Sequence, residues 1–171
     1  MTDLAVIILA AGKGTRMKSS LHKVLHPIAG KPMLIHLLDN LAEPSPARTV
    51  VVAGDRQGQI DAALEGRDVS TALQEPQLGT AHAALQAKGA LDGFSGNILV
   101  CFGDVPMVQA ETVRRLADAL DGDAKVAVLA FRTADPAAYG RVIADEDGTL
   151  VKMVEFKDAS DAEREISLCN S

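Results

Sequence analysis

Leu4-Ala-Val-Ile-Ile-Leu-Ala-Ala-Gly-Lys-Gly-Thr-Arg-Met17 begins with an unbroken apolar run and ends in small residues, two glycines and two basic side chains. A short apolar run of this kind is typical of a parallel strand that is buried on both faces. Because Gly12 and Gly14 have no Cβ, the backbone N–H groups that follow the strand can turn toward an anion. We therefore predict a buried strand over residues 4–9 that ends in an anion-binding loop.

Charge is distributed unevenly along the chain. Residues 4–38 contain five basic and no acidic side chains, whereas the remaining residues contain 12 basic and 23 acidic ones and carry a charge of −11. A local positive segment in an acidic chain favours a pocket for a small anion over a nucleic-acid surface. Aromatic residues make up only 3% of the chain and Trp is absent, which argues against base-stacking platforms for nucleic acid.

The overall composition is typical of an ordinary globular domain. A chain of 171 residues with 47% apolar residues can bury a sizeable core as one domain. No apolar run approaches the roughly 20 residues that cross a bilayer, so we expect no membrane partner. The first residues lack the features of a signal peptide, and Cys101 and Cys169 have no metal-binding spacing. We therefore expect reduced thiols and a cytoplasmic location.

Apolar segments with strand and helix periodicity alternate through most of the chain, which predicts an α/β fold with a mostly parallel sheet flanked by helices. The later part changes pattern: Asp145-Glu-Asp-Gly148 predicts a hairpin that gives the sheet a mixed edge, and Ser160 with Glu163 predicts a helix capping box. The further predicted strands cover residues 49–53, 69–73, 97–102 and 125–131, and the predicted helices cover 33–41, a short segment closing over 61–64, about 80–90, and 111–120.

Three loops follow predicted strands, at residues 9–17, 74–80 and 102–106. Ligands of open α/β sheets bind beyond the carboxyl ends of the strands. We therefore expect these loops to form one shared pocket. In the third loop, Asp104 offers a hard carboxylate that suits Mg²⁺, with phosphates and waters supplying the other ligands. The alternative is an aspartate that only forms a turn before Pro106.

The glycine motif itself matches neither of two common phosphate-binding patterns. Met17 replaces the third glycine of a dinucleotide fingerprint, and no Gly-Lys-Ser/Thr follows at the spacing of a Walker A loop. The longer string does match a known pattern. Leu9-Ala-Ala-Gly-Lys-Gly-Thr-Arg-Met17, Lys23-Val-Leu-His26 and Gly30-Lys-Pro-Met33 resemble the signature of sugar-1-phosphate nucleotidyltransferases. The resemblance is greatest to the uridyltransferase domain of the bacterial bifunctional N-acetylglucosamine-1-phosphate uridyltransferase/glucosamine-1-phosphate acetyltransferase.

The resemblance extends along essentially the whole chain. It includes Leu73-Gln-Glu-Pro-Gln-Leu-Gly-Thr-Ala-His82, Tyr139-Gly-Arg141, Val154-Glu155 and Asn170. It implies a Rossmann-like fold of the nucleotide-diphospho-sugar transferase type. It also implies UTP and N-acetylglucosamine-1-phosphate as substrates, UDP-N-acetylglucosamine and pyrophosphate as products, and Mg²⁺ as cofactor. The substrate-binding residues that it implies are Leu9, Ala10, Ala11, Gly12, Gly14, Lys23, Gln74, Gly79, Thr80, Gly103, Asp104, Gly140, Glu155 and Asn170.

Nucleotidyl transfer is an in-line displacement at the α-phosphorus, and its catalysis consists mostly of positioning and charge neutralisation. Arg16 can bind two phosphate oxygens at once and Lys23 can act as a point charge, so these two are the catalytic candidates. Gln74 and the backbone at Gly79 and Thr80 suit recognition of a nucleobase edge, although loop capping explains them equally well from the residues alone. The four histidines show no catalytic or metal-binding spacing, and we interpret them as structural.

Two features depart from the family pattern. His22 stands where the family usually has proline, which we expect to loosen the loop that places Lys23. The sequence also stops at Ser171, before the family's second metal-ligating Asn and its acetyltransferase domain, so we expect residues 1–171 to be a C-terminally truncated nucleotidyltransferase domain. Two alternatives remain open: guanylyl or cytidylyl transfer, and nucleotide binding without turnover. A homo-oligomer is compatible with the resemblance.

Overall fold

The computed structural model describes residues 3–120 and 122–170, and of Arg16 only the backbone. The chain divides into two compact units, Met1–Arg115 and Leu116–Ser171. Each unit has its own sheet.

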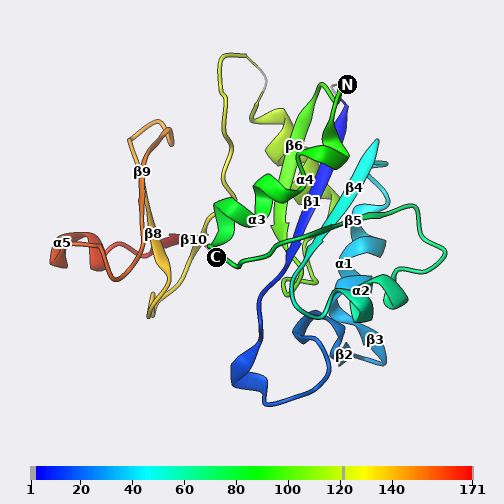
Figure 1. Ribbon diagram of the computed structural model, residues 1–171. Helices are drawn as coiled ribbons and strands as arrows, with labels where there is room; N and C mark the ends of the chain where they lie inside the picture. The colour runs from blue at the N-terminus through cyan, green and yellow to red at the C-terminus, as the bar shows by residue number, and fades with distance from the viewer. Residues whose placement is uncertain (1–2, 121, 171) are drawn as a thin grey trace. The chain divides into compact units, whose positions relative to one another are not determined.

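The first unit is built on a four-stranded parallel sheet with the order β5-β4-β1-β6 (Figure 1). The strands are β1 (Leu4–Ala10), β4 (Arg48–Ala53), β5 (Ser70–Leu73) and β6 (Asn97–Phe102). β1 pairs with β4 on one side and β6 on the other, so Ala5 lies opposite both Arg48 and Ile98. This central position explains why the β1 sequence is apolar without interruption.

Helices join these strands in the order expected of parallel crossovers. The α-helices are α1 (Met33–Leu41), α2 (Gln57–Ala63), α3 (Thr80–Gln86) and α4 (Ala110–Asp118), of which α4 runs across the boundary between the units. Short 3₁₀ turns are η1 (Thr15–Met17), η2 (Lys23–Leu25) and η3 (Gly89–Leu91), and a small hairpin joins β2 (Pro27–Ile28) to β3 (Lys31–Pro32).

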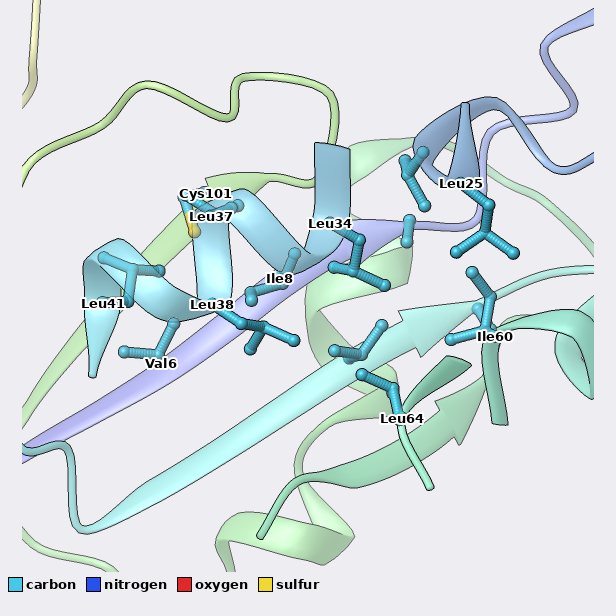
Figure 2. Close-up of a cluster of buried hydrophobic side chains, with 14 of the residues drawn as sticks. Val6, Ile8, Leu25, Leu34, Leu37, Leu38, Leu41, Ile60, Leu64 and Cys101 are labelled. Carbon is cyan, nitrogen blue, oxygen red and sulfur yellow. The ribbon is translucent and has the colours of Figure 1, made fainter. Parts of the chain in front are cut away.

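The two faces of β1 belong to different clusters of buried side chains. Val6 and Ile8 pack with four leucines of α1, which recur at helical spacing and are drawn in Figure 2: Leu34, Leu37, Leu38 and Leu41. Ile7 and Leu9 point to the opposite face and pack with Ala83 and Ala87. Since burial of one leucine contributes about 1.5–3 kcal/mol, the α1 face anchors β1 firmly and fixes the position of the loop that follows it.

The second unit is an antiparallel sheet with the order β7-β10-β8-β9. Its elements are β7 (Phe131–Arg132), β8 (Gly140–Ala144), β9 (Leu150–Val154), α5 (Asp161–Arg164) and β10 (Leu168–Asn170). Arg141 is only 2% exposed; its guanidinium donates to the backbone carbonyls of Tyr139 and Arg164 and lies 5.5 Å from the centre of the Phe156 ring. These contacts satisfy a charge that would otherwise be costly to bury.

The predicted fold class is confirmed, and so are the parallel strands, the hairpin around Asp145-Glu-Asp-Gly148 and the capping box at Ser160 and Glu163. Two finer predictions are wrong. The hairpin does not form a mixed edge of the first sheet, because β8 and β9 pair within the second unit's own sheet. Residues 125–130 form no strand, because no described strand pairs with them, and Val126 and Leu129 remain exposed.

Candidate active site

Three loops of the first unit meet at the carboxyl ends of β1, β5 and β6. The glycine loop (residues 10–17) follows β1, the glutamine loop (residues 74–80) follows β5, and the aspartate turn (residues 102–106) follows β6. A pocket of about 350 Å³ lies between them. It is lined by Leu9, Ala10, Ala11, Gly12, Lys23, Val24, Gln74, Gln77, Gly79, Thr80, Ala83, Phe102 and Asp104. The expected convergence of the three loops is therefore present.

The glycine loop brings Lys23 close to its own backbone. Gly14 adopts a left-handed conformation with φ of 57°, and a Cβ built there would lie 2.9 Å from Cβ of Lys23. Any larger residue at position 14 would be strained and would push Lys23 away. Gly14 thus acts on the pocket indirectly, by allowing Lys23 to reach it.

Lys23 and Asp104 form an ion pair at the pocket, between Nζ and Oδ2. His22 supports this arrangement from the preceding position. Its backbone N–H donates to Oε1 of Gln59 at 2.8 Å, and its Nδ1 accepts a hydrogen bond from the backbone of Val24 at 3.4 Å. Burial, and then the nearby Arg56 charge, lower the pKa of His22 and keep the ring neutral. The expectation that His22 loosens the loop is wrong, because this buried ring caps η2 and holds it.

The aspartate turn offers a magnesium ion one protein carboxylate, that of Asp104. Within residues 3–120 and 122–170, no three His, Cys, Asp or Glu side chains gather to hold a metal ion. Asp104 is a single carboxylate that already attracts one cation, the ammonium of Lys23. A site with one carboxylate suits Mg²⁺ that takes its other ligands from phosphates and water.

The glutamine loop is fixed to the end of β1 by Gln77. Its Nε2 donates to the backbone carbonyl of Ala11 at 2.7 Å. Gly54, at the end of β4, leaves room for this contact, since a Cβ there would lie 2.4 Å from Nε2 of Gln77 and 2.7 Å from the Ala11 oxygen. The ends of three strands are therefore packed together beside the pocket.

Gln74 lines the pocket with a side chain whose orientation is determined by its contacts. It is 4% exposed, and its Nε2 donates to the Gly79 carbonyl at 2.9 Å and lies 3.2 Å from Nδ1 of His82.

Cys101, in β6, is not a nucleophile. Burial raises the pKa of its thiol to about 12, so the thiol is protonated. Among the described residues, the polar lining of the pocket therefore consists of two glutamine amides, Thr80, backbone groups and the Lys23–Asp104 pair.

Most of the predicted substrate-binding residues of the first unit line this pocket; the exceptions are Gly14 and Gly103. Gly103 packs beneath the pocket, where its N–H donates to the Leu9 carbonyl at 2.9 Å and a Cβ would meet Val24 at 3.2 Å. The side chain of Arg16 lies outside the described residues, so its predicted catalytic role stays a prediction.

Gly140, Glu155 and Asn170 lie together at one end of the second unit's sheet. Gly140 pairs with Asn170, and a Cβ at Gly140 would lie 2.3 Å from Oδ1 of Asn170. Glu155 is exposed and directly follows Val154, the residue opposite Arg141. Oδ1 of Asn170 is buried without a hydrogen-bond partner among the described residues. The three residues thus form one cluster that contains an unsatisfied acceptor.

Four lining residues were not predicted: Val24, Gln77, Ala83 and Phe102. Val24, Ala83 and Phe102 are apolar and form one wall of the pocket. In the sequence they look like ordinary core residues, so no pattern marks them as pocket residues. Gln77 is different, because it lies in the same motif as Gln74. Gln77 could have been predicted, because it is a second amide in a loop that is already expected to reach the pocket.

The family of MobA-like NTP transferase domains matches residues 6–152. The chain belongs to this family. It is therefore a nucleotidyltransferase, as predicted. The chain is 60% identical to the bifunctional protein GlmU of Novosphingobium aromaticivorans over 172 residues, which cover 99% of this chain and 38% of that protein. It is 61% identical to GlmU of Sphingopyxis alaskensis over 98% of this chain and 37% of that protein. The predicted resemblance is confirmed, and the chain spans about 38% of the length of these relatives.

Solved structures show the same fold at low sequence identity. HddC from Yersinia pseudotuberculosis superimposes with a TM-score of 0.70 and 23% identity, over 91% of this chain and 69% of that one. A nucleotidyl transferase from Methanothermobacter thermautotroptrophicus gives a TM-score of 0.60 and 24% identity, over 82% of this chain and 65% of that one. Among the described residues, no helix has the length and apolar character needed to span a membrane.

Proposed function

We propose that the chain transfers a uridylyl group from UTP to N-acetylglucosamine-1-phosphate and forms UDP-N-acetylglucosamine and pyrophosphate. A phosphate oxygen of the sugar phosphate attacks the α-phosphorus of UTP, a new P–O bond forms, and the bond to the β-phosphate breaks. This substrate assignment is supported by the identity of 60% with a GlmU protein over nearly the whole chain. The free cysteines, Cys101 and Cys169, support a cytoplasmic location, where thiols stay reduced.

The triphosphate occupies the side of the pocket formed by the glycine loop, Lys23 and Asp104. Backbone N–H groups near Gly12, where no Cβ blocks an approach, face the phosphates together with the Lys23 ammonium. Arg16 neutralises the charge that develops on the leaving pyrophosphate. Asp104 would hold Mg²⁺, which would supply further charge neutralisation to the phosphates.

The uracil lies against the glutamine loop. Gln74 reads one edge of the base through its amide, and the backbone at Gly79 and Thr80 approaches the same ligand. Phe102, Val24 and Ala83 provide apolar surface for the nucleoside. A pocket with apolar walls and a few convergent polar groups is typical of small-molecule sites.

The sugar phosphate is held by the second unit. Gly140, Glu155 and Asn170 occupy one end of its sheet, and the carboxylate of Glu155 can accept hydrogen bonds from sugar hydroxyls. The exposed position of Glu155 also leaves its carboxylate accessible to a ligand.

The convergence of the glycine loop, Gln74 and the Lys23–Asp104 pair in one pocket is the observation that carries this proposal. Pyrophosphate release is measured with UTP, CTP, GTP or ATP, each with N-acetylglucosamine-1-phosphate and Mg²⁺. We expect release with UTP in preference to the other nucleotides. Release only with GTP or CTP would instead identify guanylyl or cytidylyl transfer. Calorimetric binding of UTP without release would identify a binding module.

A further inference from the structure

The return segment (residues 19–22) leads from the glycine loop to Lys23, and two side chains at the start of α2 hold it. Gln59 contacts it with both ends of its amide: Oε1 accepts from the His22 backbone N–H at 2.8 Å, and Nε2 donates to the Ser20 carbonyl at 3.0 Å. A backbone N–H can only donate and a backbone carbonyl can only accept, so these contacts fix which end of the amide is oxygen. Gln59 therefore spans the return segment.

Arg56, the residue before α2, holds the same backbone with its guanidinium. Its Nη1 donates to the Ser19 and Ser20 carbonyls at 3.0 and 3.1 Å and lies 3.3 Å from the Leu21 carbonyl. Hydrogen bonds from a charged donor are stronger than those from a neutral one. Together, Arg56 and Gln59 contact backbone groups of every residue in the return segment.

The position of Lys23 depends on what holds η2 at each end. Burial of Val24 and Leu25 in the core anchors the C-terminal end of η2. Lys23 is the first residue of η2 and follows the return segment directly, after residues 12–18 that are exposed over most of their length. A segment with few buried contacts opens readily unless hydrogen bonds hold it. The contacts of the return segment with α2 therefore anchor the end of η2 that carries Lys23.

We infer that Gln59 and Arg56 are positioning residues for Lys23: they fix the return segment so that the Lys23 ammonium is held at the phosphates. This inference rests on the proposed function, in which Lys23 faces the triphosphate. Gln59 and Arg56 are not among the described residues that line the pocket, so their effect on a ligand is indirect. Without them, the affinity for the triphosphate falls with the fraction of time that Lys23 spends in place.

A double-mutant cycle tests this role by calorimetry of UTP binding at saturating Mg²⁺, in wild type, Gln59→Leu, Lys23→Met and the double variant. We expect Gln59→Leu to raise the UTP dissociation constant about tenfold, as for a Lys23 that is in place about a tenth of the time. In the Lys23→Met background, the same substitution should have almost no effect. Gln57→Leu is the matched control on the same helix, because the Gln57 amide donates to Thr71 instead, at 3.4 Å; it should bind UTP as wild type does.

Equal losses of UTP affinity in the two backgrounds would overturn the inference, because a merely structural defect weakens binding whether or not Lys23 is present. An unchanged dissociation constant in a folded Gln59→Leu would overturn it as well. If Gln59→Leu fails to fold, Arg56→Met takes its place in the cycle, where simple loss of its charge would again act equally in both backgrounds. Failure of the proposed function gives a different result, since Lys23→Met alone would then bind UTP as tightly as wild type, and the inference would fall with it.

Discussion

Lys23 and Asp104 form an ion pair although 81 residues separate them in the chain. The pair joins η2, which follows the glycine loop, to the turn after β6. The two side chains are 35% and 32% exposed, so the pair contributes little to stability. Its significance is chemical, because the proposed metal ligand is already in contact with a cation that belongs to the protein.

Lys23→Met should tighten the binding of a divalent cation in the absence of nucleotide and also slow pyrophosphate release. The ammonium and the metal ion compete for the same carboxylate, and removal of the ammonium leaves Asp104 free. Mn²⁺ binding measured by calorimetry or electron paramagnetic resonance tests this competition. Lys31→Met is the matched control, because Lys31 pairs with Asp39 instead, at 2.8 Å. Equal Mn²⁺ affinity in wild type and Lys23→Met would refute the competition.

Asp104→Asn should reduce turnover by roughly 100-fold or more, the usual cost of removing one preorganised electrostatic group. The melting temperature should hardly change, because among the described residues the hydrogen bond and ion pair of Asp104 involve only Lys23, at a partly exposed position. Pyrophosphate release at increasing Mg²⁺ concentration, together with thermal unfolding, separates the two effects. Wild-type turnover in this variant would remove Asp104 from the mechanism.

Gly54→Ala should destabilise the first unit by about 1–3 kcal/mol and weaken nucleotide binding, as expected for an overpacked site. The added methyl group would collide with the Gln77 amide and with the backbone at Ala11, and would push the glutamine loop away from the end of β1. Gly58→Ala provides the comparison, because a Cβ at that position meets nothing within 4 Å. Chemical denaturation and calorimetry should show no penalty in Gly58→Ala; an equal effect in both variants would mean that the packing at Gly54 is unimportant.

Glu163 should titrate far below an ordinary glutamate. The hydrogen bond from Lys152, and then those from the Ser160 backbone and hydroxyl, lower its pKa to about 2 from its ordinary value of 4.5. Because the folded-state pKa is depressed, the stabilisation from Glu163 is complete above pH 4.5 and is lost as the pH falls toward 2. Carboxyl titration by nuclear magnetic resonance measures the midpoint, and Lys152→Met should raise it. A wild-type midpoint near 4.5 would contradict the contacts of Glu163 with Lys152 and Ser160.

The sequence predicted those features that depend on local pattern. The apolar run in β1, the leucine spacing of α1, and Ser160 with Glu163 each have a length, periodicity or spacing that favours one local structure. The convergence of the three loops also followed, because the carboxyl ends of parallel strands share one edge of a sheet.

What the sequence could not predict depends on partners that are distant along the chain. Residues 125–130 have the composition of a strand, but a strand also requires a neighbouring backbone, which composition does not report. His82 has no unusual spacing, and its relation to Gln74 becomes visible only when α3 brings the ring beside the amide. The contact of Gln77 with Ala11 likewise joins two loops that are 66 residues apart.

Hydrogen–deuterium exchange with and without UTP and Mg²⁺ tests most directly whether the triphosphate binds in this pocket. We predict slower exchange at backbone amides of the glycine loop, the glutamine loop and the aspartate turn, with the exposed strand β9 as the internal reference. Protection confined to other parts of the first unit, with these three loops unchanged, would contradict the assignment of the pocket as the nucleotide site.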